Sequence, residues 1–177
     1  MELSYLYIKN IERPLNNIEI NFSSLFNFSF EESIHRLHIE KKDDSQIDRT
    51  KILYGDNIDN IKLLIGKNGT GKTTIMQLLG LDSQTRLSEF KTHKAGSDKI
   101  EYAWFAVYHI AEDQFVVEGY NFEFFFGKNN TCINNKALKP FYSVCFAYDY
   151  KNKTTKCEVL SQFFRNDDIT INNLRNL

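Results

Sequence analysis

A glycine-rich stretch in the first half of the chain constrains its fold more than any other feature. Residues 66–73 read Gly-Lys-Asn-Gly-Thr-Gly-Lys-Thr and match the pattern G-x-x-x-x-G-K-[ST] in full. A short apolar run precedes this stretch, and apolar residues recur at helical spacing after it. Glycines let backbone N–H groups approach an anion closely, and the start of a helix points further N–H groups at the same place. The sequence therefore predicts a buried strand over 61–65, a phosphate-binding loop over 66–74 and a helix that ends at Gly80.

Each residue type in this loop has a physical role in phosphate binding. We expect the glycines to permit positive φ, and Lys72 to place its ammonium group on the β- and γ-phosphates. Thr73 offers a hydroxyl to Mg²⁺, and Thr74 offers one to the α-phosphate. The predicted cofactors are therefore ATP and Mg²⁺, with Thr73 as the metal ligand and no catalytic residue assigned. The predicted nucleotide-binding residues are Gly66, Lys67, Asn68, Gly69, Thr70, Gly71, Lys72, Thr73 and Thr74.

The stretch Leu64–Thr74, with Asn68-Gly69 at its centre, resembles the Walker A loop of the ABC-type ATPases. Within that group it is most similar to the SMC/RecF/OLD-like branch, the AAA-family ATPases of prokaryotic genomes. The resemblance implies an α/β fold, a P-loop NTPase lobe in which strand, Walker A loop and helix join a largely antiparallel β subdomain.

The same resemblance divides the chain into parts of one ATP-binding lobe over residues 1–177. N-terminal strands occupy 1–60, with an insertion at 23–60. The strand–loop–helix unit follows at 61–80, and the antiparallel β subdomain at 100–160. The resemblance implies an ATP hydrolase with a second ATPase head as partner. It also implies nucleic acid as a partner, which no residue pattern in this chain indicates independently.

Two motifs of such ATPases, the acidic Walker B strand and a serine–glycine signature loop, are not found in the sequence. The nearest match to the acidic Walker B strand is Val144–Asp149, but Tyr150 stands where glutamate is expected, and a strand that ends in a turn is the favoured interpretation. Gln162 stands near the position of a magnesium-contacting glutamine, although a surface polar residue is favoured there. We therefore expect hydrolysis to need a C-terminal lobe and a second head. Two alternatives stay open: a self-contained small P-loop enzyme that uses Asp149 for Mg²⁺, and a non-catalytic interaction module that holds nucleotide.

Outside the loop the chain is rich in Phe and Tyr and reads mainly as strands. Alternating apolar residues predict a β-hairpin over 2–22 and continue through 25–40. A short helix over Ser83–Phe90 and a polar loop over Lys91–Lys99 are also expected. The later predicted strands lie at 100–110, within 115–126, and in a hairpin formed by 141–149 and 154–160.

Composition limits the remaining function classes. Lys and Arg number 22 against 23 Asp and Glu, so the chain is not a polycation that coats nucleic acid or anionic lipid. The three cysteines have no metal-type spacing, which predicts reduced thiols and a cytoplasmic location. His35 and His38 would face opposite sides of a strand and make a poor metal pair. No apolar run approaches the roughly 18 residues that cross a bilayer, so no membrane partner is expected.

Overall fold

The computed structural model describes residues 2–12, 15–43, 54, 61–81, 89–90, 93–95, 98–100, 102–121, 125, 141–149, 152 and 154–160. The strands are β1 (Glu2–Glu12), β2 (Leu15–Asn21), β3 (Phe26–Glu31), β4 (Arg36–Lys41), β5 (His93–Ala95), β6 (Asp98–Ile100), β7 (Ala103–Ala111), β8 (Gln114–Tyr120), β9 (Phe141–Asp149) and β10 (Thr154–Leu160). The helices whose bounds lie within the described residues are the 3₁₀ turn η1 (Glu32–Ile34) and the α-helix α2 (Lys72–Gly80).

Six strands form the main sheet in the order β10-β9-β8-β7-β1-β2, and each neighbouring pair is antiparallel. Its central strands β1 and β7 carry apolar side chains on both faces, and β-branched and aromatic side chains fit such a pleated surface. The predicted hairpin over 2–22 is confirmed as β1 and β2, with Ile8 opposite Ile18. The predicted hairpin of 141–149 and 154–160 is confirmed as β9 and β10.

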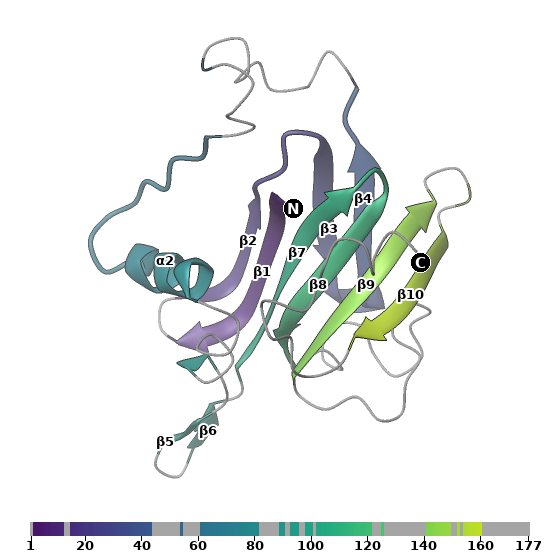
Figure 1. Cartoon of the computed structure of the whole chain (residues 1–177). Helices are drawn as coiled ribbons and strands as arrows, with labels where there is room; N and C mark the ends of the chain where they lie inside the picture. Colours follow the sequence, from purple (N-terminus) through teal and green to yellow (C-terminus); the bar gives the residue numbers. More distant parts are fainter. Residues whose placement is uncertain are drawn as a thin grey trace.

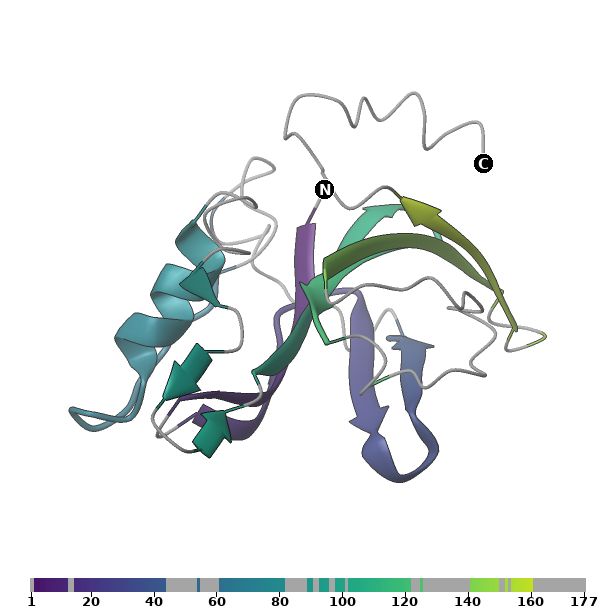
Figure 2. The ribbon, with the colours of Figure 1, turned by 90° about the horizontal axis from the view of Figure 1, so that it is seen from below.

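Alternation along β1 creates the two apolar faces of the sheet. Leu6 and Ile8 face α2, whereas Tyr5 and Tyr7 face the separate hairpin β3–β4. Figures 1 and 2 show α2 on one side of the sheet and the β3–β4 hairpin on the other. The central strands are thereby covered on both faces, with α2 lying over the β1–β2 end of the sheet.

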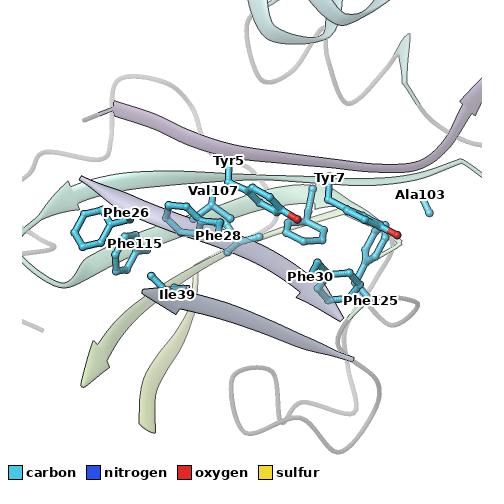
Figure 3. Packing of buried hydrophobic residues seen from close by; sticks show 12 residues of the cluster. Tyr5, Tyr7, Phe26, Phe28, Phe30, Ile39, Ala103, Val107, Phe115 and Phe125 are labelled. Atoms are coloured by element: carbon cyan, nitrogen blue, oxygen red, sulfur yellow. The ribbon is translucent and has the colours of Figure 1, made fainter. Parts of the chain in front are cut away.

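The face toward the β3–β4 hairpin is filled by aromatic rings. Tyr5 stacks on Phe28 with ring centroids 5.5 Å apart, and Tyr7 lies 5.0 Å from Phe30 (Figure 3). Phe105 of β7 completes contacts with both tyrosines. Such ring pairs add about 0.5–1.5 kcal/mol each beyond area burial, so the aromatic runs of the sequence serve as core.

A polar cluster ties η1 to the first strand. Lys9 Nζ lies 2.8 Å from both carboxylate oxygens of Glu32, and the Tyr7 hydroxyl donates to Glu32 Oε2 at 3.1 Å. Hydrogen bonding from Lys9 holds the pKa of Glu32 below its usual range. Burial, together with the negative charge of Glu32, raises the pKa of Tyr7 from 10.0 to about 12. The cluster closes one end of the aromatic layer.

The predicted α/β fold class is wrong. Residues 61–67 have no regular secondary structure, and every strand pair that the structure describes is antiparallel. Both neighbours of β1 are already present, since β2 pairs with one edge and β7 with the other. The fold is therefore an antiparallel sheet with one described α-helix on its face, and no P-loop strand–loop–helix unit is inserted into it.

The run expected to be a buried strand is instead exposed. Leu63 and Ile65 are 81% and 80% exposed, and Ile61 and Leu64 are 50% and 38% exposed. An apolar run specifies a need for burial but not a partner, so periodicity alone cannot place it in a sheet. This is the main error of the sequence interpretation.

Other predictions differ in detail. The strand expected over 100–110 is β7, and that expected within 115–126 begins as β8. Lys91–Lys99 is not simply a loop, because it contains β5 and the first two residues of β6, and these two strands pair. The helix expected over Ser83–Phe90 lies almost wholly outside the described residues.

Candidate functional site

The backbone of the glycine loop (residues 66–74) adopts conformations that depend on glycine at two positions. Gly69 has φ of +78°, and Gly71, the N-cap of α2, has φ of +85°. Both lie in the left-handed region, where a side chain is disfavoured. Gly66 does not, contrary to expectation. Its hydrogen leaves room for Thr70, whose Oγ1 would lie only 2.8 Å from a Cβ at that position.

The lysine of the motif folds back over the loop. Lys72 Nζ donates to the carbonyl oxygens of Gly66 at 2.6 Å and Lys67 at 2.7 Å. The hydroxyl of Thr70 also donates to the Lys67 carbonyl, at 2.8 Å. An ammonium group has three N–H donors, so these two contacts leave one for an incoming acceptor. The loop carbonyls thus hold the Lys72 ammonium group over the loop.

The start of α2 supplies donors at the same place. The Ile75 N–H donates to the carbonyl of the N-cap Gly71 at 3.0 Å, which is the first hydrogen bond of the helix. The N–H groups of Lys72, Thr73 and Thr74 precede it in the first turn and have no partner within the helix. Thr73 is exposed and Thr74 half-buried. These amides, the hydroxyls and the positive end of the helix dipole favour a bound anion.

Charge around the loop has one sign. Residues 61–81 contain Lys62, Lys67 and Lys72 but no Asp or Glu. Lys62 and Lys67 are exposed, as are the loop residues 66–70. Within this segment a strongly negative ligand such as a polyphosphate meets lysines and no carboxylate.

Apolar contacts hold the loop and helix on the sheet. Ile75 and Leu78 of α2 are buried in a cluster with Leu6 and Ile8 of β1. Leu15, the first residue of β2, belongs to the same cluster and is 2% exposed. A Cβ at Gly71 would lie 2.5 Å from Leu15 Cδ2, so the leucine packs directly under the helix N-cap. Sequence reasoning missed Leu15, since nothing in the pattern links it to a loop so distant in the chain.

Of the other residues that the sequence singled out, those that the structure describes lie outside the loop and α2. Asp149 ends β9, which β8 and β7 separate from β1, and Figure 1 shows β9 and α2 at opposite ends of the sheet. His35 contacts the Phe125 carbonyl at 3.0 Å, and His38 lies 3.3 Å from Glu31 Oε2. Gln162 is outside the described residues. The sheet therefore does not bring Asp149 beside the loop.

Comparisons of the chain with protein-family models, with curated proteins and with solved structures find no match. In the part of the chain that the structure describes, no helix combines the length and hydropathy needed to span a bilayer.

Proposed function

We propose that the glycine loop binds the phosphates of a nucleoside triphosphate, with ATP and Mg²⁺ as the ligand pair. One observation carries the proposal: the complete G-x-x-x-x-G-K-[ST] pattern coincides with two left-handed glycines at the N-terminus of α2. A glycine-rich turn without a binding role has no reason to combine exposed amides, a lysine bonded to the loop carbonyls and the N-terminus of a helix.

The residues of the loop divide the phosphate contacts among them. Lys72 donates its remaining N–H to the β- and γ-phosphates while its other two donors keep the ammonium on the loop carbonyls. The first-turn amides receive the β-phosphate, and the hydroxyl of Thr74 reaches the α-phosphate. Excess positive charge in residues 61–81 favours ligands with more phosphates.

Thr73 fits the role of Mg²⁺ ligand. Its side chain is exposed in the first turn of α2, where a hydroxyl oxygen can complete the shell of a cation that the phosphates carry. The described residues contain no group of three His, Cys, Asp or Glu side chains placed to hold a metal ion by themselves. Mg²⁺ would therefore arrive with the nucleotide, where it neutralises phosphate charge.

Hydrolysis and a second ATPase head form the less direct part of the proposal. They rest on the resemblance of residues 64–74 to the Walker A loop of the ABC-type ATPases. The fold that this resemblance implied is not found, so the loop is the sole support for this part of the proposal. The glycine loop and α2 contain no carboxylate to orient an attacking water. We therefore propose that the chain alone binds ATP but turns it over slowly, and that it does so in the cytoplasm.

Isothermal titration calorimetry with Mg-ATP tests the binding proposal. Lys72→Ala removes a charged hydrogen bond of about 1.5–3 kcal/mol and should weaken binding by about 10- to 150-fold. Lys62→Ala is the matched control, because it removes the same charge from an exposed position outside the loop. Its affinity should stay within about twofold of wild type, since a screened charge outside the loop contributes little. No saturable binding by the wild-type chain, or equal effects of the two substitutions, would contradict the proposal.

A further inference from the structure

Leu15, which is distant in the chain, packs against Gly71, the N-cap of α2. Gly71 must keep φ near +85° for the next residue, Lys72, to start the helix. The Leu15 side chain fills the space beside the α-carbon of Gly71. A Cβ on Gly71 would lie 2.5 Å from Leu15 Cδ2, 2.7 Å from Cγ and 3.2 Å from Cδ1. A larger residue at position 71 would therefore require Leu15 to move.

The support is itself held rigidly. Leu15 is 2% exposed and opens β2, where its backbone pairs with Glu12 next to a bulge in β1. Its cluster includes Ile75 and Leu78, the buried residues of α2. The hairpin β1–β2 therefore contacts the helix both under its N-cap and along its buried side.

We propose that Leu15 is a positioning residue for phosphate binding, acting by holding Gly71 and hence the first-turn amides and Lys72 in place. This inference rests on the function proposed above. Donor groups must be held within about 0.5 Å of the productive position to be effective. Shortening Leu15 leaves a void beneath the N-cap into which the loop backbone can shift. The amides would then point at the phosphates less accurately.

The test separates positioning from general loss of stability. Leu15→Ala should weaken Mg-ATP binding by about tenfold, and Leu15→Met, which preserves side-chain volume, should restore most of that affinity. Ile39→Ala is the matched control, because Ile39 is also a buried aliphatic residue but belongs to the cluster on the opposite face of the sheet from α2 and Gly71. It should lower the melting temperature comparably and leave the dissociation constant within about twofold, since the loop keeps its support. Leu15→Val serves the same purpose if Leu15→Ala does not fold.

A second readout needs no nucleotide. Amide hydrogen exchange of residues 71–75 in the free protein should accelerate in Leu15→Ala and stay near wild type in Ile39→Ala, whose void lies on the other face of the sheet. Equal exchange in the two variants, or equal ATP affinity, would overturn the positioning role while leaving the binding proposal intact. Absence of ATP binding by the wild type would overturn the binding proposal, and the exchange data would then show only how the loop is held.

Discussion

Alanine substitution of the loop glycines separates two costs that the structure assigns to different positions. At Gly69, φ is +78° and no atom lies within 4 Å of an added Cβ. Gly69→Ala therefore carries only the cost of a left-handed side chain, about 1–2 kcal/mol. At Gly71, φ is +85° and the added Cβ also meets Leu15. Overpacking adds about 1–3 kcal/mol, so Gly71→Ala should lower the free energy of unfolding by about 2–5 kcal/mol.

Urea unfolding of the two single variants measures this difference, and a double variant identifies its cause. In Leu15→Ala the space beside Gly71 is empty, so adding Gly71→Ala should cost only about 1–2 kcal/mol more. Gly80→Ala is the control, because nothing lies within 4 Å of its added Cβ and no positive φ opposes it. Its effect should be neutral or slightly stabilising. If Gly71→Ala is no more destabilising than Gly69→Ala, or if the double variant shows no coupling, Leu15 does not support the N-cap and the reasoning is refuted.

Two further predictions test the exposed run and the aromatic face. Leu63→Ser should change the free energy of unfolding by less than about 0.5 kcal/mol, because Leu63 is 81% exposed; a loss of 2 kcal/mol or more in urea unfolding would show that it is buried. The raised pKa of Tyr7 means that folding favours the neutral phenol, so this contribution is complete below pH 10 and is lost as the pH rises through about 12. Tyr7→Phe should show a shallower loss of stability over that interval, and an identical pH profile would contradict the assignment.

Local patterns in the sequence account for the parts of the structure that were predicted. The alternation of Leu6 and Ile8 with Tyr5 and Tyr7 dictates a strand with two buried faces, and its short distance to β2 favours an antiparallel hairpin. The left-handed conformation of Gly69 and Gly71 follows in the same way, because it depends on residue type and immediate neighbours.

The errors involve contacts between distant residues. The run Ile61–Ile65 has the composition of a buried strand, but such a run does not specify a partner, and in the structure it pairs with none of the described strands. The contact between Leu15 and Gly71 joins the start of β2 to the start of α2. Neither segment has a sequence pattern that predicts contact with the other. The packing of Leu15 against Gly71 is therefore visible only in the folded chain.

The central claim is that the glycine loop receives a triphosphate, and an NMR titration of the ¹⁵N-labelled chain with Mg-ATP tests it most directly. We predict saturable shifts of the amide resonances of Gly69, Gly71, Lys72 and Thr73, with no such shifts when adenosine is added. Amide resonances of the loop that remain unmoved at saturating Mg-ATP, or that respond equally to adenosine, would contradict it.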